Sequence, residues 1–595
     1  MKTKFNGILT LLLAFVVQFS FAQEKTISGT VTDGSGPLPG VTILVKGTKT
    51  GTQTDFDGKF SLSVDTGKVL IFSYVGMKTV NVTVGSSNTV NVIMQEDANL
   101  LDEVIVTAYG TSTKEAFTGS ASVVGEKDLS IRNVTSPIAA IEGKATGVQF
   151  TSASGQPGSS PGIIIRGVGT LNGNATPLYI VDGMQYEGAL STINQEDIAS
   201  FTILKDAAST SLYGSRAANG VVLITTKTGT KGDIKASVSA QVGMVDRGIA
   251  NYDELTAGQY YETMWEALKN SNAGDGNPAY ASANIYNQLG YNPFNVPNDQ
   301  IVGTDGRLNP SANLIYKSLD WYDVMEQSGA RSNYNINIAG GGDKHKVFFS
   351  ASYLDEEGYV VTTSFDRLTT RLNADFELND RITMGGSANI TISNSTGPTS
   401  AGSGSIVNPF GFAKNIGSVY PVYLNDLQGN LVLDAAGNPV FDNGEGYSEY
   451  NIGTRPISQG RHALQELLLN DERTRNNTYG FRYYADFKII EGLNFRLNYG
   501  RDINELLSKE YENNIIGDAQ PTGRYAETRA RREVENFNQI LSFNKTFNDV
   551  HNLEITAGHE SFDRQYSSMF GRAIEQTAEG IYEFDNFANI NGLGG

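Results

Sequence analysis

The feature that most constrains the fold of this chain is the alternation of apolar and polar residues in several long segments between residues 231 and 595. In residues 372–378, the even positions are Leu, Ala, Phe and Leu, and the odd positions are Asn, Asp and Glu. Similar segments are 333–338, 481–488 and 493–499. Because successive side chains of a β-strand point to opposite faces, this pattern predicts strands with one apolar and one polar face.

The lengths of these segments and of their connections favour a membrane barrel over a soluble sandwich. Strands in soluble sandwiches are usually ~5–6 residues long, whereas these run near ~10, the length that a tilted strand needs to cross a bilayer. Tight turns at Asn379-Asp380 and Glu491-Gly492 alternate with long connections such as 394–477. We therefore predict an up-and-down antiparallel barrel whose apolar face meets lipid. A soluble all-β enzyme domain is the alternative.

The first residues predict export. Lys2 and Lys4 precede an apolar run over 8–17, and the small-x-small sequence at 20–22 is a typical cleavage site. This pattern predicts a signal peptide, and the apolar run is too short to span a bilayer as a helix. A buried N-terminal helix is the alternative.

Residues 27–95 read as a small β-sandwich. About seven short apolar-rich runs are separated by turn signals, which is the pattern of a sandwich domain. Asp55 and Asp57 in the sequence DFDG suggest a calcium loop, but the spacing of ligands in an EF-hand is missing. We interpret DFDG as a hairpin turn.

Residues 113–230 read as a compact α+β domain. Short buried-type strands are expected in 162–169 and 177–184, and 196–227 reads as strand, short helix, strand. Five charged residues here have either a catalytic interpretation or a structural one as internal ion pairs, which we favour: Arg166, Asp182, Lys205, Asp206 and Arg216. The glycines of 167–173 have the wrong spacing for a dinucleotide-binding loop.

Between these two domains lies an isolated strand pattern, LLDEVIVTAYG at 100–110. Its flanks are polar, so the strand is accessible, and an exposed strand edge is a template for pairing with another chain. Residues 251–330 differ from the alternating segments, because they contain a helical pattern with Tyr260, Tyr261 and Trp265. These aromatic residues are expected in a core, with stacking on a sugar as the alternative.

Composition excludes several classes of function. The formal charge of −19 and the lack of basic runs argue against nucleic-acid binding. The chain has no cysteine, hence no disulfide, thiol nucleophile or Cys-bound metal. We expect no metal, no cofactor and no enzymatic activity, because the four histidines show no metal-ligand spacing: His345, His462, His551 and His559.

Several motifs, in this order, resemble the SusC/RagA family of TonB-linked outer-membrane transporters. PLPGVTILVKGTKTGTQTDFDGKFSLSV resembles a carboxypeptidase-regulatory-like domain with a transthyretin-like fold, and LDEVIVTAYG resembles a TonB box. IIIRG, PLYIVDG and LKDAASTSLYGSRAANGVVLITTKTG resemble the plug signature. The resemblance divides the chain into a signal peptide (1–22), a regulatory-like β-sandwich (23–98), the TonB box and linker (99–112), a plug domain (113–230) and a partial barrel with extracellular loops (231–595).

The resemblance also implies site residues and partners. The TonB box is expected to pair by strand addition with TonB, which is driven by the inner-membrane ExbB/ExbD motor. Its residues are Asp102, Glu103, Val104, Ile105, Val106, Thr107, Ala108 and Tyr109. The plug signature is Arg166, Gly167, Asp182, Gly183, Lys205, Asp206, Tyr213, Gly214, Arg216, Asn219 and Gly220. A SusD-like surface lipoprotein, outer-membrane lipid and a glycan or peptide substrate complete the expected partners.

The resemblance predicts a mostly β fold in which residues 231–595 form about half of a 22-stranded transmembrane barrel. We count nine clear strands and two further ones between 503 and 534, where 22 strands would need roughly twice this length. The chain is therefore expected to be a truncated importer of oligosaccharides or peptides. The alternatives are a TonB-linked signalling receptor, a siderophore or cobalamin transporter, and, from the regulatory-like domain alone, an enzyme.

Overall fold

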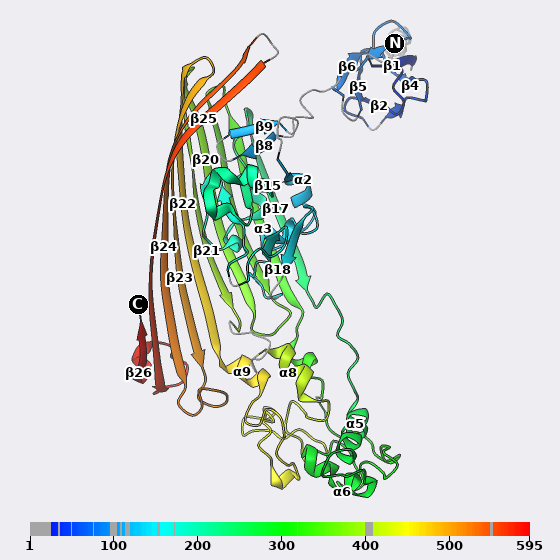
Figure 1. Ribbon diagram of the computed structural model, residues 1–595. Coiled ribbons are helices and arrows are strands. Elements are labelled where there is room, and N and C mark those ends of the chain that lie inside the picture. Colours follow the sequence, from blue (N-terminus) through cyan, green and yellow to red (C-terminus); the bar gives the residue numbers. More distant parts are fainter. Residues whose placement is uncertain are drawn as a thin grey trace, which may run out of the picture. The chain divides into compact units, whose positions relative to one another are not determined.

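The computed structural model describes residues 25–594 except 34–35, 49, 75–76, 96–103, 108–109, 114–118, 152–154, 172, 318, 399–407 and 548–550. The predicted signal peptide and four residues of the predicted TonB box (Asp102, Glu103, Ala108 and Tyr109) lie outside the described residues. The chain divides into two compact units, one ending near residue 118 and one that holds nearly all of the rest (Figure 1). Each unit is described by itself.

The first unit is the predicted β-sandwich. One sheet has the order β4(Lys59–Val64), β1(Lys25–Thr32), β7(Val92–Ile93), and the other has the order β3(Gly51–Gln53), β2(Thr42–Val45), β5(Val69–Ser73), β6(Val80–Thr83). Alternate residues of these strands fill the core, which includes Ile27, Ile43 and Phe72. The DFDG segment is a turn between β3 and β4, in which Asp55 Oδ1 accepts hydrogen bonds from the backbone N–H groups of Asp57 and Lys59.

The second unit begins with an α+β domain around a five-stranded sheet of order β10(Ala121–Gly125), β15(Ile198–Leu204), β16(Val221–Thr226), β13(Leu178–Val181), β14(Met184–Gln185). A separate hairpin pairs β11(Val148–Thr151) with β12(Gly162–Ile165). Short helices connect the strands: α2(Glu126–Leu129), α3(Pro137–Ala140), η2(Leu190–Thr192), η3(Gln195–Asp197), α4(Ala207–Thr210) and η4(Ser211–Ala217). An apolar core that includes Ile141, Phe201 and Ile224 lies between them.

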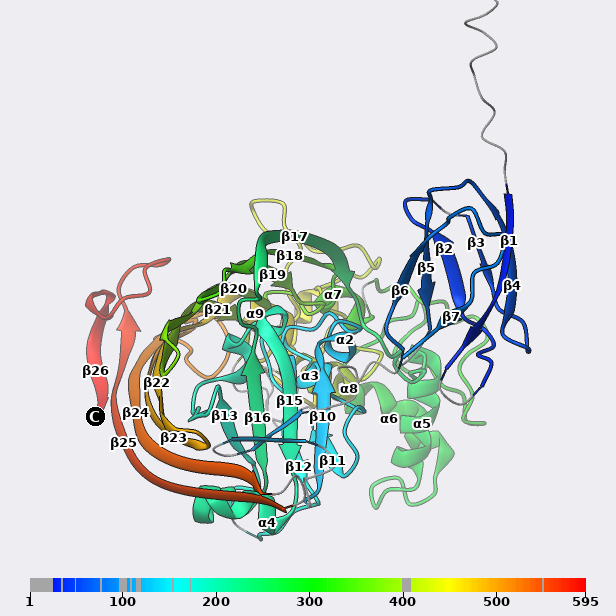
Figure 2. The same cartoon turned by 90° about the horizontal axis from the view of Figure 1, so that it is seen from above.

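A ten-stranded antiparallel sheet follows, with its strands paired in chain order. The strands are β17(Gly232–Val245), β18(Gly329–Gly341), β19(His345–Glu357), β20(Ser364–Asn379), β21(Ile382–Thr396), β22(Asp471–Ile490), β23(Leu493–Glu512), β24(Arg524–Phe547), β25(His551–Gln576) and β26(Phe587–Gly594). Seen from above, the sheet curves around the α+β domain (Figure 2). Its concave side is called the lumen face here, and its convex side the outer face.

The alternation predicted from the sequence is present, but the predicted strand lengths are wrong. Strands β17 to β25 have 13 to 26 residues rather than about ten. The two further strands expected between 503 and 534 are the far ends of β23 and β24. Both faces of these ends are polar, so the alternation that reveals a strand in the sequence is lost there.

Connections differ between the two ends of the sheet. At one end, the tight-turn rim, β20 joins β21 across Asp380 and Arg381, and β22 joins β23 across Glu491 and Gly492, as predicted. At the other end, the long-loop rim, the connections include 246–328 and 397–470. This strict alternation of short and long connections is the pattern of an up-and-down barrel wall.

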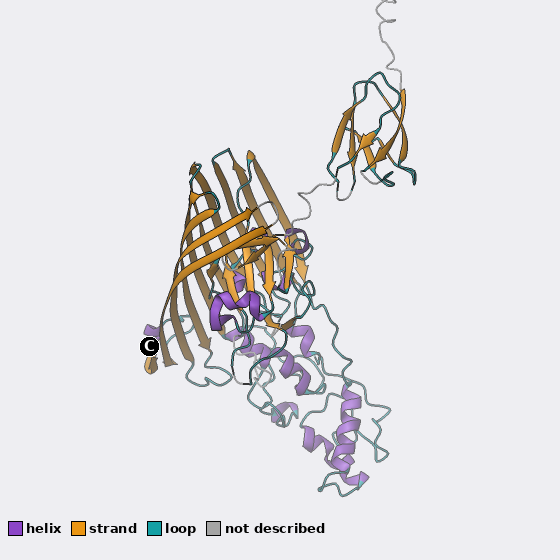
Figure 3. Cartoon of the chain, turned by 45° about the horizontal axis from the view of Figure 1, so that its top comes forward, coloured by secondary structure: helices purple, strands orange, loops and turns teal. Residues whose placement is uncertain are grey.

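The two longest connections fold together into a loop domain with a core of its own. Its helices are α5(Ala257–Lys269), α6(Pro278–Leu289), α7(Trp321–Met325), α8(Pro409–Ile416), η5(Ser448–Tyr450) and α9(Ala463–Leu469) (Figure 3). Tyr261 and Trp265 are buried in this core, and Tyr260 packs against it, as the core interpretation predicted. No helix in the described part of the chain is long and apolar enough to cross a membrane.

Candidate functional site

The lumen face holds the α+β domain through a buried cluster of charges centred on Asp182. Asp182 lies in the turn after β13, and its Oδ2 accepts a hydrogen bond from Arg371 Nη2 of β20 at 2.6 Å. Its Oδ1 accepts one from the backbone N–H of Thr226 at 2.9 Å. Nearby, Arg482 of β22 donates to the backbone carbonyl of Val181 at 3.1 Å and pairs with Asp502 of β23 at 2.9 Å.

Burial opposes the charge on Asp182, yet the surrounding groups favour it. Burial would raise the pKa of Asp182, but the guanidinium groups of Arg371 and Arg482 and the N–H of Thr226 together hold this pKa below its usual value. The carboxylate is therefore ionised at neutral pH, and its ion pair with Arg371 spans the boundary between domain and wall. Breaking a buried pair by removing one partner leaves an uncompensated charge, which is strongly destabilising.

A second group of contacts anchors the turn that contains η2 and η3. Arg367 of β20 is buried and donates to the backbone carbonyls of Ser191 at 2.6 Å and Thr135 at 3.0 Å. Asn194 Nδ2 donates to Ser352 Oγ of β19 at 3.0 Å. Burial raises the pKa of the neighbouring Asp197, although Arg371 and Arg367 lower it in part. This turn is thus fixed to two strands of the wall.

The opposite side of the domain meets β24 and β25 more loosely. Arg532 donates to the backbone carbonyl of Glu187 at 2.8 Å, and Arg564 pairs with the Glu187 carboxylate at 3.3 Å. Arg216 donates to Gln185, pairs with Glu560 at 3.3 Å and lies over the ring of Phe562 at 4.5 Å. A cavity of 230 Å³ remains beside these residues.

The other predicted plug residues mostly stabilise the domain internally. Lys205 Nζ donates to Ser122 Oγ and to the Thr146 carbonyl, and burial lowers the pKa of this amine. Asp206 Oδ2 accepts from the N–H of Ser120 at 2.6 Å, and Asn219 donates to the Asn174 carbonyl at 2.8 Å. Arg166 is exposed, and Tyr213 lines the 230 Å³ cavity.

The backbone conformation explains the predicted glycines. Gly167, Gly183, Gly214 and Gly220 all have positive φ, a conformation that glycine adopts without strain. At Gly220, with φ of 93°, a Cβ atom would also lie 2.7 Å from Ile165 Cδ1 and 3.1 Å from the Leu204 carbonyl oxygen. Any side chain there would disturb the contact between β12, β15 and β16.

Reasoning from sequence did not single out the residues of the wall that complete the cluster. None of the wall residues Arg367, Arg371, Arg482 and Asp502 is among the predicted site residues. A signal was present, since an arginine on the polar face of a strand that is apolar on the other side is expected to face protein or water. Its partner in the α+β domain was not readable without the structure.

The predicted TonB box is described only in its centre. Val104–Thr107 forms strand β8, which pairs with β9(Gly110–Thr113) in a two-stranded sheet. A two-stranded hairpin by itself is marginally stable in water. The segment is therefore a strand, as predicted, with a short partner.

Comparisons with known proteins agree with this geometry. The CarboxypepD_reg-like domain model matches residues 27–106, and the TonB-dependent Receptor Plug Domain model matches 113–221. The chain is 31% identical to TonB-dependent receptor P39 of Formosa agariphila, over 99% of this chain and 51% of that protein. It is 32% identical to TonB-dependent receptor SusC of Bacteroides thetaiotaomicron, over 62% of this chain and 34% of that protein.

Among solved structures, the RagAB peptide importer in its open-open state matches with a TM-score of 0.62 and 22% identity, over 83% of this chain and 52% of that chain. This likeness supports the fold: a plug domain within a curved antiparallel wall. TonB-dependent receptor P39 matches nearly the whole of this chain, and the chain spans about half of the length of that relative.

Proposed function

We propose that this chain, which belongs to the SusC-like TonB-dependent receptors, acts in the outer membrane as a receptor and transporter for oligosaccharides or peptides. The observation that carries this proposal is the plug: an α+β domain with an apolar core of its own, attached to the lumen face by largely buried polar contacts. A domain bound in this way closes a passage and is able to leave it without unfolding the wall.

The chemistry of the contact suits a closure that opens. Among the described contacts named above, the plug is attached by ion pairs and hydrogen bonds such as Asp182–Arg371 and Asn194–Ser352. In a low-dielectric site these interactions are strong, but water that enters the interface solvates both partners and weakens them. Force that admits water at one point would therefore loosen the rest.

The strand Val104–Thr107 is the proposed point where that force is applied. Strand addition uses the main-chain N–H and C=O groups of an exposed edge. Within the described residues, strand β8 pairs with one short neighbour, β9, which leaves its other edge for pairing. We propose TonB, coupled to ExbB/ExbD, as the partner, with Asp102–Tyr109 as the paired segment.

Three further parts complete the proposal: the barrel, the substrate and a partner protein. The ten strands are proposed to belong to a larger closed barrel, since an unpaired edge in lipid leaves backbone groups unsatisfied, at several kcal/mol for each group. RagAB is a peptide importer, which supports a peptide substrate here, while a glycan substrate rests on the family resemblance of the sequence motifs. A SusD-like lipoprotein is the proposed partner at the long-loop rim.

The test is deletion of residues 102–109 in the receptor that carries this chain. We expect binding of substrate to isolated outer membranes to persist and uptake by cells to stop. Oligosaccharides and peptides are supplied in parallel, so the same experiment separates the two substrate classes. Uptake at the wild-type rate after the deletion would contradict the proposal.

A further inference from the structure

On the outer face of the sheet, apolar residues give way to polar or charged ones at nearly the same distance from the tight-turn rim on each of five strands. Counted from the tight-turn rim, the apolar outward residues just before this change are Leu368, Ile392, Tyr479, Ile503 and Phe537 on β20 to β24. The next outward residues are Asp366, Asn394, Asn477, Glu505 and Glu535. Arg501 interrupts the apolar region, and it pairs with Glu533 and Glu535.

The height of this apolar belt fits a bilayer. From Leu378 to Leu368 the outward residues of β20 cover ten steps along the strand. At ~3.3 Å for each step and a tilt of roughly 40°, they span about 25 Å, which is the height of the lipid-facing band of a membrane barrel. The strands then continue past the belt, which explains why they are longer than the sequence pattern predicted.

Just beyond the belt, two cavities adjoin on the outer face. One, of 730 Å³, is lined by residues of β20 to β23, among them the outward Asp366, Asn394, Arg475 and Leu507, together with Leu468 and Leu469 of α9 and Tyr582. The other, of 490 Å³, is lined by outward residues of β22 to β25. Arg475 and Leu507 line both cavities, so the two form one outer trough centred on this pair. Most of the strand residues that line the trough are outward ones, and a few, such as Ser395 and Thr474, belong to the lumen face.

The acidic residues in the outer trough already have partners. Asp471 pairs with Arg473 at 2.7 Å, and Glu505 pairs with Arg531 at 2.7 Å. Asp366 accepts a hydrogen bond from Asn394 at 2.8 Å. Arg475 differs from Arg473 and Arg531. It donates to Asn477 at 3.2 Å, and no carboxylate in the described part of the chain lies within ion-pair distance of it. Leu507 beside it supplies an apolar floor.

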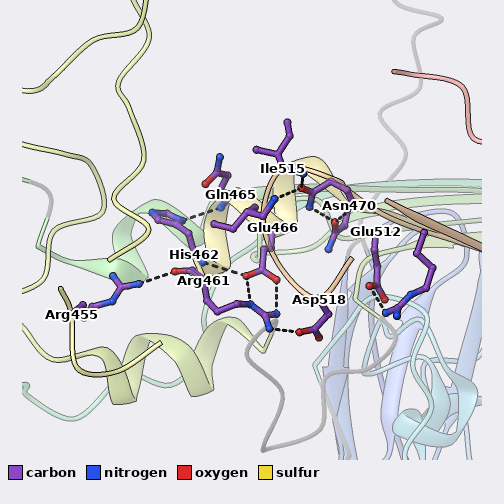
Figure 4. A network of polar contacts seen from close by, with 12 residues as sticks. Arg455, Arg461, His462, Gln465, Glu466, Asn470, Glu512, Ile515 and Asp518 are labelled. Carbon is purple, nitrogen blue, oxygen red and sulfur yellow. Dashed lines mark hydrogen bonds and ion pairs between the residues drawn. The ribbon is translucent and has the colours of Figure 1, made fainter. Parts of the chain in front are cut away.

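One wall of the outer trough is fixed by a polar network at the long-loop rim (Figure 4). Arg461 donates to both carboxylate oxygens of Glu466 on α9, at 2.8 and 2.7 Å, and pairs with Asp518 of the β23–β24 loop at 2.5 Å. Asn470 accepts two hydrogen bonds from Asn513 of the same loop. Helix α9, which forms this wall of the trough, is thus held in place by contacts with the β23–β24 loop.

The network also makes this wall insensitive to pH in the neutral range. His462 caps α9, with its Nδ1 accepting from the N–H of Gln465 at 3.1 Å. Burial lowers the pKa of His462 to about 3, so the ring is neutral and remains an acceptor well below pH 7. The helix cap and the trough wall that it supports therefore persist in mildly acidic surroundings.

We propose that the outer trough binds a phosphate-bearing lipid headgroup of the outer leaflet. Arg475 is the residue that contacts the phosphate, because a guanidinium donates two parallel hydrogen bonds to phosphate oxygens and this one has no anionic partner. Arg529 borders the same trough and is paired with Glu527, and Leu507 contacts the carbon atoms of the headgroup. The inference rests on the proposed location of the sheet in the outer membrane.

The experiment measures binding of lipid A to the purified receptor that carries this chain, in a neutral detergent, by native mass spectrometry and by titration calorimetry. Arg475→Gln is compared with Arg381→Gln, an exposed arginine at the tight-turn rim. We expect at least tenfold weaker binding in Arg475→Gln and no change in Arg381→Gln. Arg529→Gln is a second variant in case the first fails to fold, with a smaller expected loss.

Three further arms decide between sources of binding. Diacylglycerol tests the apolar floor alone, and binding as tight as that of lipid A would overturn the proposal. Inorganic phosphate that displaces lipid A would show a phosphate site open to free anions, which also contradicts a headgroup site. Flotation with liposomes tests membrane insertion separately: a receptor that inserts but binds no lipid A refutes this inference and leaves the proposed function intact, whereas a receptor that does not insert refutes the location.

Discussion

The two faces of the ten-stranded sheet carry the same residue types in opposite circumstances. On the lumen face, Arg371 is paired with Asp182 of the plug, and its side chain is 5% exposed. On the outer face, Arg531 is paired with Glu505 of the neighbouring strand, and its side chain is 48% exposed. The comparison teaches that the role of an arginine on a barrel strand can be inferred only when two things are known. These are the face on which it lies and its distance from the apolar belt.

The difference is energetic as well as geometric. An ion pair in water gains little, because the solvent screens it, and such pairs are worth ~0–1 kcal/mol. A buried pair is costly to form, but removal of one partner typically costs about 3–5 kcal/mol, since the other charge is left without compensation. The lumen face therefore determines whether the plug stays docked, and the outer face contributes little to stability.

The largest expected effect is loss of plug docking in Arg371→Ala. This change leaves Asp182 buried without its ion pair, and we expect docking to weaken by about 3 kcal/mol. Limited proteolysis of the plug in outer-membrane preparations measures the effect. Arg531→Ala is the matched control on the other face, and equal proteolysis of both variants would contradict the distinction between the faces.

The next effect follows from substitution at Gly220. Ala at this position meets a positive φ and the close contacts of Ile165 and Leu204, so we expect a loss of about 1–3 kcal/mol in plug stability. Thermal unfolding of the purified chain measures it. Gly243→Ala, in open space on β17, provides the control and is expected to be nearly neutral.

The pH dependence of docking sharpens the role of Asp182. Because its folded pKa lies below the unfolded value of about 3.8, the ionised carboxylate contributes stability above that pH. This contribution is lost as pH falls through the lower, folded pKa. We expect the stability difference between wild type and Asp182→Asn to be full at pH 6 and to shrink below pH 4, as followed by denaturant titration. A difference that stays constant down to pH 2 would exclude the ion pair as its cause.

The smallest expected effect is that of Arg531→Ala itself. Its two carboxylate partners, Glu505 and Glu533, are in contact with solvent or with other arginines after the change, so the loss should stay below about 1 kcal/mol. Urea unfolding of wild type and variant in parallel checks this value. A loss of several kcal/mol would indicate that another surface covers the outer face in this region.

Much of the architecture was predictable from the sequence. Four features each depend on local patterns within one segment. They are the seven-stranded sandwich, the succession of strand, short helix and strand in 196–227, the tight turns and the alternating wall. The core positions of Tyr261 and Trp265 followed from helical spacing. These features need no knowledge of distant residues.

The site was predictable only on the plug side. Asp182 was selected because of its motif, but Arg371 is 189 positions away in sequence and belongs to a different element. Strand ends beyond the apolar belt were missed because neither face there is apolar. The outer trough was equally invisible, since it joins residues of six strands, α9 and the β25–β26 loop.

The most direct test of the account locks the plug to the wall. The chain has no cysteine, so Asn194→Cys with Ser352→Cys introduces a single pair at a contact of 3.0 Å between plug and β19. In the receptor that carries this chain, we predict that the oxidised form binds substrate but does not import it, and that a reductant restores uptake. Each single variant serves as a control. Import at the wild-type rate by the fully cross-linked receptor would contradict the claim that the plug must leave this wall.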